Sequence, residues 1–221
     1  DWELGYTYTA PRLSLGVNLY YMKYKDQLVP MGRINDGYDA LNDNVDDSYR
    51  RGVELSASWK VTGWFTASAN ATFSQNRIES YVDALKDSPT YGKELGDMTI
   101  AYSPDVIANA FLNFHHRGFE AVFHTQHVGK QYFTNNENDA LSLDAYCVTN
   151  LNLAYTFRTR SARSVRLGLQ INNLFNAEYE SNGYGYSYMD TWSGPAPVRI
   201  DEAYYFPQAP LNVLANVTVK F

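Results

Sequence analysis

The side chains best suited to binding chemistry are aromatic residues that recur at every second position late in the chain. They begin in the run 183–188 and continue near residues 192 and 204. Aromatic rings can stack on sugars or other flat ligands, and they supply contact area at a low entropic cost. The same row would arise if a strand simply continued beyond its sheet, because alternate side chains of a strand share a face. Both interpretations stay open, and the ligand-binding candidates are Tyr184, Tyr186, Tyr188, Trp192, Tyr204 and Tyr205.

The histidines and the acidic residues make a weak case for a metal site. His124 and His127 are three apart, so on one strand they point to opposite faces and cannot bind one ion together. An acidic segment carries enough oxygen donors for calcium but lacks the regular spacing of a calcium loop, which favours a solvated extracellular loop. The segment contains Asp36, Asp39, Asp43, Asp46 and Asp47. We therefore predict no bound metal.

The sequence carries no pattern of residues that indicates catalysis. Serine, histidine and aspartate are all present, but no nucleophile-elbow motif and no glycine-rich phosphate loop occurs. A net charge of −6 argues against nucleic acid as a partner. Cys147 is the single cysteine, which excludes an intrachain disulfide and a cysteine-based metal site. We expect a protein that is not an enzyme, has no cofactor and binds no nucleic acid.

The elements that must position these side chains are strands, and the last eleven residues show their pattern most clearly. Alternate positions from Val213 to Phe221 are all apolar, and the positions between them are nearly all polar. Successive side chains of a strand point to opposite faces, so this stretch predicts a strand with one apolar and one polar side. It ends on an aromatic ring, as the last strand of a membrane barrel does at the lipid boundary. A transmembrane helix is excluded, because no run of about 18 apolar residues exists.

The same alternation recurs along the chain and predicts nine strands. Short turns and long loops alternate strictly between them, which is typical of an up-and-down antiparallel barrel with all short turns at one end. The sixth strand is the least regular, and a bulge is one interpretation of it. The expected strands are residues 1–9, 13–28, 52–61, 65–74, 106–115, 119–133, 150–157, 165–172 and 211–221, and the long loops are about 30–48, 82–103, 134–144 and 177–204.

The two faces of these strands differ in chemistry. One face is rich in Leu, Val and Ala, with aromatic rings near both strand ends, where the water–lipid boundary would lie. The girdle residues at the short-turn end are Trp59, Trp64, Phe114, Phe157 and Phe221. The other face is polar, and its expected lumen- or plug-facing residues are Asn18, Glu54, Asn70, Asn109, Asn113, Asn150, Asn152, Arg166, Asn172, Asn212 and Asn216. A soluble sheet with its apolar face inward has the same pattern, but strand length, girdles and the terminal Phe favour the membrane.

Several segments carry a more specific signal than alternation. The most specific is Asn-Leu-Phe-Asn at 173–176, followed by Tyr179. The others are 18–29, Arg-Gly-Val-Glu-Leu at 51–55, Val-Gly-Lys-Gln-Tyr at 128–132 and the terminal strand. Together these segments resemble the C-terminal end of a TonB-dependent outer-membrane receptor, in a style similar to receptors of the Bacteroidetes. The resemblance covers essentially the whole chain.

The resemblance implies an all-β transmembrane barrel of about 22 strands, closed by an N-terminal plug. Residues 1–221 would then be the C-terminal part of that barrel domain, without the plug and the TonB box. It implies capture of a scarce nutrient (siderophore, haem, cobalamin or oligosaccharide) and its import with TonB-derived energy. A passive porin or fatty-acid channel is the alternative, and a soluble carbohydrate-binding module is a further one.

The implied partners are outer-membrane lipid and lipopolysaccharide, the N-terminal remainder of the receptor with its plug, TonB through that remainder, a small-molecule nutrient, and the barrel assembly machinery, which reads the terminal Phe221. The implied location is the outer membrane of a Gram-negative bacterium, crossed many times, with the C-terminus in the periplasm.

Overall fold

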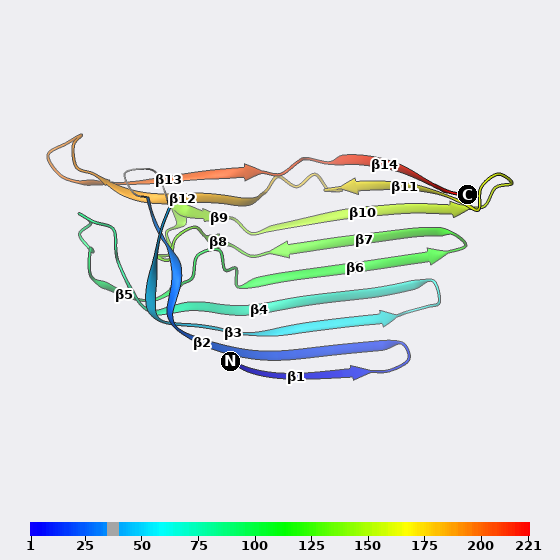
Figure 1. Ribbon diagram of the computed structural model, residues 1–221, viewed down its shortest axis with the longest axis horizontal. Helices are drawn as coiled ribbons and strands as arrows, with labels where there is room; N and C mark the ends of the chain where they lie inside the picture. Colours follow the sequence, from blue (N-terminus) through cyan, green and yellow to red (C-terminus); the bar gives the residue numbers. More distant parts are fainter. Residues whose placement is uncertain (35–39) are drawn as a thin grey trace.

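The fold is a long antiparallel sheet, seen in a computed structural model that describes residues 1–34 and 40–221. Within these residues, nine strands follow one another in the sheet in the order β1-β2-β3-β4-β6-β7-β10-β11-β14, and β5 pairs beside β4 (Figure 1). Their bounds are β1 Trp2–Thr9, β2 Leu13–Ile34, β3 Ala40–Lys60, β4 Phe65–Val82, β5 Glu94–Thr99, β6 Val106–His116, β7 Phe119–Val128, β10 Tyr146–Phe157, β11 Ser164–Asn172 and β14 Asn212–Lys220. The prediction of nine antiparallel up-and-down strands is confirmed.

The connections sort by length to the two ends of the sheet, as expected. The turns after β1, β3, β6 and β10 lie together at the right of Figure 1, and the long connections lie at the left. The β6–β7 turn has positive φ at both Arg117 (47°) and Gly118 (84°), the conformation of the two-residue hairpins whose twist matches that of a sheet. A Cβ on Gly118 would lie 2.3 Å from the Thr156 carbonyl oxygen, so this turn requires glycine. We refer below to the short-turn end and the long-connection end.

The strand register places the apolar side chains on one continuous face. Ala67 of β4 is opposite Leu112 of β6, which is opposite Phe123 of β7. The row continues through Leu151 of β10 to Ile171 of β11. Directly opposite residues of antiparallel strands share a face. The alternation of apolar and polar residues in the sequence therefore gives the sheet one apolar face and one polar face. Leu112 is 42% exposed, and many large apolar side chains of this face are exposed in the same way. An apolar surface of this extent indicates contact with an apolar surrounding.

The sixth expected strand ends earlier than its pattern suggested and contains no bulge. β7 stops at Val128, and its register against β6 and β10 is unbroken over its whole length. Its pattern is mixed because Thr125 and His127 lie on the otherwise apolar face. His124 is on the polar face, so the expectation that the two histidines point to opposite sides is confirmed. After Gly129 the chain leaves the sheet and forms the short strand β8 (Gln131–Tyr132).

Several strands extend further than expected at the long-connection end, so the interpretation as a loop was wrong for residues 30–34 and 40–48. Pairing between β2 and β3 continues past Lys25, opposite Asp47, to Pro30, opposite Asn42, and after a shift in register it includes Ile34 opposite Ala40. Polar composition suggested a loop, but opposite charges and side-chain hydrogen bonds support pairing of strands that project into water. Asp43, Asp46 and Asp47 lie on β3, whereas Asp36 and Asp39 lie outside the described residues. The expected loop 82–103 likewise contains β5, and β10 begins at Tyr146 rather than at residue 150.

The best-packed side chains lie at the long-connection end rather than along the sheet. One cluster joins Val29, Ile78, Tyr81 and Ile100, all at most 5% exposed. Another joins residues that follow β7, in a segment that holds β8, the 3-10 turn η1 (Asp139–Leu141) and β9 (Ser142–Leu143). Its members are Phe133, Leu141 and Leu143, at most 2% exposed. The expected loop at 134–144 is therefore a small packed unit, and the long connections form a folded cap.

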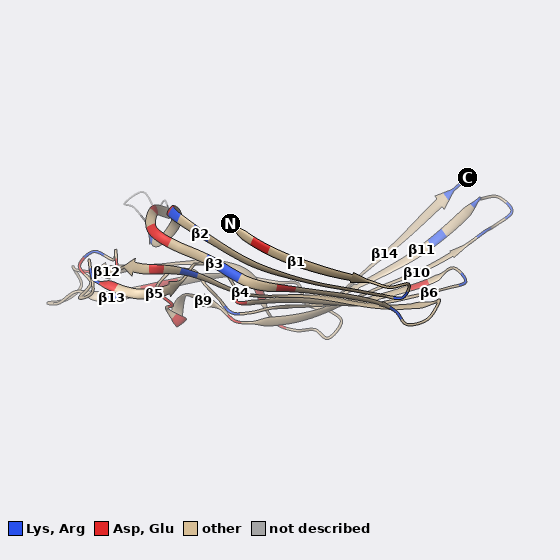
Figure 2. Cartoon of the chain, turned by 90° about the horizontal axis from the view of Figure 1, so that it is seen from below, with Lys and Arg blue, Asp and Glu red and all other residues tan. Residues whose placement is uncertain are grey.

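The sheet is curved, with β1 and β14 both bent towards the same side (Figure 2). Its polar face is crowded: a Cβ on Gly16 would lie 2.5 Å from Ser56 Oγ, and a Cβ on Gly168 would lie 2.5 Å from Asn216 Oδ1. Glycine at these two positions leaves room for the side chains of the neighbouring strands. No helix in the described residues is both long and apolar enough to cross a membrane.

Candidate binding site at the long-connection end

The tyrosine-rich segment forms a β-hairpin, so its interpretation as a loop over residues 177–204 was wrong. β12 (Glu180–Asp190) pairs with β13 (Val198–Pro207), and this hairpin stands apart from the main sheet. Tyr184 is opposite Tyr204, and Tyr186 is opposite Glu202, so these side chains share one face. Gly183 is opposite Tyr205, which puts Tyr205 on the other face. The tyrosines recur at every second position because they lie on a strand, which was one of the two interpretations of the sequence.

Two glycines fix this hairpin against the packed cluster below it. A Cβ on Gly183 would lie 2.7 Å from the Phe133 ring, and one on Gly185 would lie 2.9 Å from both Phe133 and Leu141. Phe133 is 1% exposed and Leu141 is fully buried. The alternation of glycine with tyrosine in β12 thus has a physical reason. One face must approach the cluster closely, and the other carries large rings.

The rings on the open face form a stacked row. The Tyr184 and Tyr204 ring centroids are 4.9 Å apart with an interplanar angle of 15°. Tyr186 lies 6.4 Å from Tyr204 and 6.4 Å from Tyr188. Offset stacking of this kind is favourable and holds the rings in a fixed orientation. Such a row offers a preformed platform for a flat ligand.

Glu202 lies at the centre of this row and accepts hydrogen bonds from three tyrosines. The hydroxyls of Tyr186, Tyr204 and Tyr188 donate to its carboxylate at 2.7, 2.9 and 3.2 Å. The bond from Tyr186 and those from Tyr204 and Tyr188 stabilise the charged form and lower the pKa of Glu202. The same bond to Glu202 raises the pKa of the Tyr186 hydroxyl, and burial adds to the effect. At neutral pH the centre is one carboxylate surrounded by protonated phenols.

A cavity of about 340 Å³ lies where this hairpin meets the β2–β3 hairpin. Its aromatic lining comes from separate parts of the chain, and Arg33 of β2 contributes a cation. The Nε of Arg33 is buried and has no hydrogen-bond partner among the residues that the structure describes. The lining residues are Pro30, Gly32, Arg33, Leu41, Tyr102, Phe133, Tyr184, Gly185, Tyr186 and Tyr204. A buried donor without a partner suits an anionic group of a ligand.

The structure brings together only part of the predicted ligand site. Tyr184, Tyr186 and Tyr204 line the cavity. Tyr188 does not line it and donates to Glu202, Tyr205 packs near Phe133, and Trp192 is 76% exposed at the hairpin tip. Arg33, Tyr102 and Phe133 complete the cavity and were missed. No local pattern identifies them, because each comes from a different connection and only the packing of the cap places them near the tyrosines.

The expected lumen residues form cross-strand pairs on the polar face. Asn18 donates to Glu54 (3.2 Å), and Asn109 donates to Asn70 (3.2 Å) and bonds with His124 (3.0 Å). Further along, Asn172 donates to Asn212 at 2.8 Å, and Arg166 forms two bonds with Glu120 at 2.7 and 2.8 Å. Such pairs satisfy polar groups across the sheet.

The remaining asparagines follow the same register. Asn150 accepts from the Asn173 backbone (2.9 Å), and Asn216 lies over Gly168. Asn113 and Asn152 are each opposite Val122 of β7, which places them on this face too. The register thus collects every expected lumen residue on one side of the sheet. We propose that this side faces a lumen or a plug.

The girdle residues cluster at the short-turn end. The Phe65 and Phe114 rings stack at 4.6 Å, and Trp64 lies 6.1 Å from Phe114. Phe157 stacks near Tyr155 at 5.9 Å. Trp59 is 53% exposed and Phe221 is 93% exposed, so the structure leaves these rings free to contact a surrounding phase. Their location at one end agrees with a girdle.

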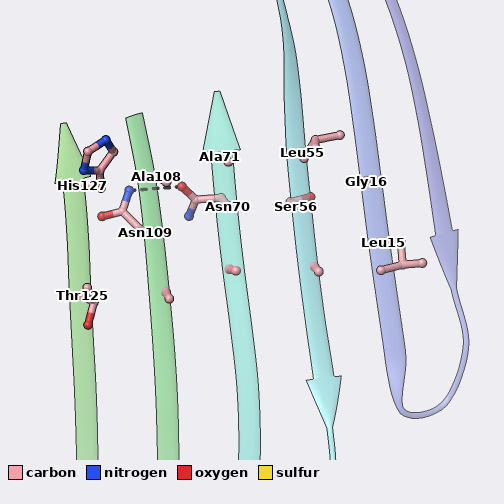
Figure 3. Close-up of a pocket in the computed structure, with 13 residues that line it drawn as sticks. Leu15, Gly16, Leu55, Ser56, Asn70, Ala71, Ala108, Asn109, Thr125 and His127 are labelled. Carbon is pink, nitrogen blue, oxygen red and sulfur yellow. Dashed lines mark hydrogen bonds between the residues drawn. The ribbon is translucent and has the colours of Figure 1, made fainter. Parts of the chain in front are cut away.

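A shallow groove runs across the apolar face over β3, β4, β6 and β7 (Figure 3). Alanines form its floor, and Leu15 and Leu55 stand on one side with His127 and Thr125 on the other. The alanines are Ala57, Ala69, Ala71, Ala108 and Ala110.

Across residues 1–34 and 40–221, no three His, Cys, Asp or Glu side chains lie close enough together to hold a metal ion.

Comparisons with solved structures identify the same sheet in much longer proteins. The ferric yersiniabactin uptake receptor FyuA from Yersinia pestis matches 99% of this chain with a TM-score of 0.65 and 19% identity, over 29% of its own length. The ferric citrate transporter FecA matches 98% with a TM-score of 0.66 and 15% identity, over 30% of its length. The copper transporter OprC matches 99% with a TM-score of 0.66 and 18% identity, over 30% of its length. At these identities the likeness shows the fold.

The chain therefore spans under a third of the length of the structures it matches. No curated protein sequence is similar enough to count as a match. The family model described as TonB dependent receptor-like, beta-barrel matches residues 1–174, which is most of the chain. Proteins of this family are outer-membrane receptors of Gram-negative bacteria. With the up-and-down sheet, its two chemically distinct faces and this match, the chain belongs to the TonB-dependent receptor β-barrel family.

Proposed function

We propose that this chain is the C-terminal part of an outer-membrane receptor barrel that captures a scarce small molecule and imports it with energy supplied through TonB. The observation that carries the proposal is the aromatic cavity at the long-connection end, with Arg33 in its wall. Pockets that combine aromatic surface with a few fixed polar groups are typical ligand sites. The membership of the family supports import, since the relatives with solved structures are named as uptake receptors and transporters.

The cavity favours one class among the nutrients that the sequence left open. Its rings suit a flat or cyclic ligand, and the Nε of Arg33, which has no partner in the described part of the chain, suits a negative charge. A siderophore complex, haem or cobalamin offers flat or cyclic surface with acidic or phosphate groups. A neutral oligosaccharide would leave the buried Nε without an anionic partner, which costs free energy. We therefore expect an anionic ligand with a ring system.

Replacement of Arg33 by glutamine tests this capture site. The loss of one charge-assisted hydrogen bond is expected to weaken binding by about 10- to 100-fold. Affinity would be measured on the whole purified receptor, against a panel of ferric siderophores, haem and cobalamin. Arg160→Gln is the matched control, because Arg160 is an exposed arginine in the turn at the opposite end. Equal affinities for the two variants would refute the role of the cavity.

The energy source distinguishes this proposal from a passive porin. Uptake of the bound nutrient is expected to stop in cells that lack TonB, whereas a passive channel would continue to admit it. The plug and the segment that contacts TonB would belong to the remainder of the receptor. The barrel assembly machinery, lipopolysaccharide and lipid remain expected partners on the same grounds of family membership.

We further propose that the long-connection end faces outward and that Phe221 lies at the periplasmic boundary. Support comes from the cavity, which must meet its ligand outside the cell, and from long extracellular loops in such barrels. Orientation can be read in intact cells with a membrane-impermeant maleimide, using receptors in which Cys147 is replaced by alanine. Ala196→Cys, in the exposed β12–β13 tip, should be labelled, and Ser161→Cys, in the β10–β11 turn, should not. The reverse pattern would invert the assignment.

A further inference from the structure

Cations gather at the short-turn end of a chain whose net charge is −6. Four turns and the end of β14 form this end, and their sequences contain no Asp and no Glu. Figure 2 shows Lys and Arg at these turns and most of the acidic residues further towards the other end. The five segments are 10–12, 60–64, 116–118, 158–163 and 220–221. They hold seven of the 18 Lys and Arg residues, which are Arg12, Lys60, Arg117, Arg158, Arg160, Arg163 and Lys220.

At two of the strand ends, a cation directly adjoins an exposed aromatic ring. Lys60 follows Trp59 in the sequence, and Lys220 precedes Phe221. Aromatic rings of this kind favour the headgroup layer of a bilayer. A Lys or Arg at the same level can lay its apolar stem along the lipid boundary while its charged group reaches the polar layer. If the rings lie at the boundary, the cations therefore lie at the level of the lipid phosphates.

Part of this end forms a cavity of about 570 Å³ where β10, β11 and β14 end near one another. Three cations line it, together with two aromatic and two hydroxyl-bearing residues, and these are Arg158, Arg163, Lys220, Phe157, Phe221, Thr156 and Ser164. Thr156 is opposite Arg166 and so belongs to the polar face, whereas Phe157 is opposite Val165 and belongs to the apolar face. The cavity thus lies at the rim of the sheet, where the two faces meet.

We propose that this cavity binds the headgroup of an anionic phospholipid, with the phosphate against Arg158, Arg163 and Lys220. The planar guanidinium group matches the geometry of phosphate oxygens, and serine and threonine hydroxyls can donate to those that remain. The aromatic residues on the apolar side would contact the first part of the acyl chains. A ligand with one charged and one apolar end fits these mixed walls, whereas a free phosphate would use only the polar ones.

The breadth of the basic end favours a membrane over an acidic protein segment as the partner. The cations come from turns that extend across the sheet from β1 to β14 (Figure 1). A lipid leaflet presents phosphates along that whole edge, and clustered cations next to a membrane span attract anionic lipid. A single peptide would cover only a few of the turns. The inference rests on the proposed crossing of the bilayer, but it does not depend on which end faces outward.

Native mass spectrometry of the whole detergent-purified receptor tests this site, because it counts the lipid molecules bound to each receptor and gives their dissociation constants. We expect phosphatidylglycerol to bind at least about tenfold more tightly than phosphatidylcholine, whose choline group the cations repel. Inorganic phosphate should bind more weakly than either lipid. Each cation lost should weaken phosphatidylglycerol binding about fivefold, which corresponds to about 1 kcal/mol. The double variant Arg158→Gln/Arg163→Gln should therefore lose on the order of 25-fold.

The matched control removes the same charge from the other end of the sheet. Lys86 and Lys93 are exposed in the connection between β4 and β5, so Lys86→Gln/Lys93→Gln should bind phosphatidylglycerol as the unaltered receptor does. A second variant, Arg158→Lys/Arg163→Lys, keeps both charges and should stay within about fivefold of the unaltered receptor. All the replaced side chains are exposed, so these changes leave the packed regions of the fold intact.

Three results would overturn the site. They are equal affinity for the two lipids, equal losses in the Arg→Gln variant and its control, and a loss in the Arg→Lys variant as large as that in the Arg→Gln variant. Displacement of phosphatidylglycerol by an equal concentration of hexaglutamate would assign the basic end to an acidic protein segment instead, which also contradicts the proposal. A receptor that stays monodisperse without detergent would contradict the membrane crossing itself, so the two failures are distinguishable.

Discussion

Replacing Phe133 with alanine should release the β12–β13 hairpin from the cap. Phe133 is 1% exposed, and its ring contacts the positions of Gly183 and Gly185. Removal of a buried phenylalanine side chain typically costs about 3–5 kcal/mol, part of it from the cavity that remains. Because 1.4 kcal/mol corresponds to a factor of ten, amide exchange in β12 and β13 should accelerate by at least about 100-fold. Ligand affinity should fall as well, since the hairpin carries three tyrosines of the cavity wall.

The matched control for this change is Phe175→Ala. Phe175 lies in the Asn-Leu-Phe-Asn segment and is 75% exposed, so its removal leaves no cavity. Hydrogen exchange read by mass spectrometry separates the hairpin from the main sheet. Exchange that accelerates equally in β12 and in β6 would mean that Phe133 supports the whole barrel rather than the cap, contrary to this account.

An arginine at Leu112 should destabilise the barrel by about 2–4 kcal/mol, the cost of a cation on the lipid face near the bilayer midplane. Leu112 lies in the middle of β6 between Ala67 and Phe123, on the continuous apolar face. Nothing in the described chain covers it, and it is 42% exposed. Urea unfolding of the receptor in lipid vesicles would measure the loss.

The neighbouring residue gives a control of nearly identical position. Asn113→Arg places the same charge one residue along, on the polar face, where water or a plug would solvate it. This variant should lose far less stability than Leu112→Arg. Similar losses of stability in both variants would show that the two faces contact the same kind of surroundings, as in a soluble sheet packed on both sides.

The membrane-crossing part of the fold could be predicted from the sequence because period-two alternation reports directly on a sheet with unlike faces. Residues 65–74 and 165–172 show it without interruption, and short turns give each of them one partner, β3 for β4 and β10 for β11. The cap could not be predicted in this way. Its strands project into water on both sides, so their composition, as in 40–48, is that of a loop, and only long-range pairing makes them strands.

The candidate site was predictable only in part for a related reason. The tyrosine row was visible because its members are neighbours on one hairpin. Arg33 and Phe133 are a hundred residues apart and meet only through the packing of the cap; Asn135, which donates to the Pro30 carbonyl at 2.6 Å, is one of the contacts that join them. Such contacts depend on burial and on backbone hydrogen bonds, neither of which leaves a local periodic signal.

We propose that the sheet crosses a bilayer with its apolar face towards lipid and its polar face towards the lumen. Single cysteines along β6, introduced with Cys147→Ala and labelled with a fluorophore, test it directly in vesicles that contain brominated lipid as quencher. Ala110→Cys and Leu112→Cys should be quenched strongly, and Asn109→Cys and Asn113→Cys weakly, in step with the register of β6. Equal quenching at all four positions, or stronger quenching at the asparagine positions, would contradict the account.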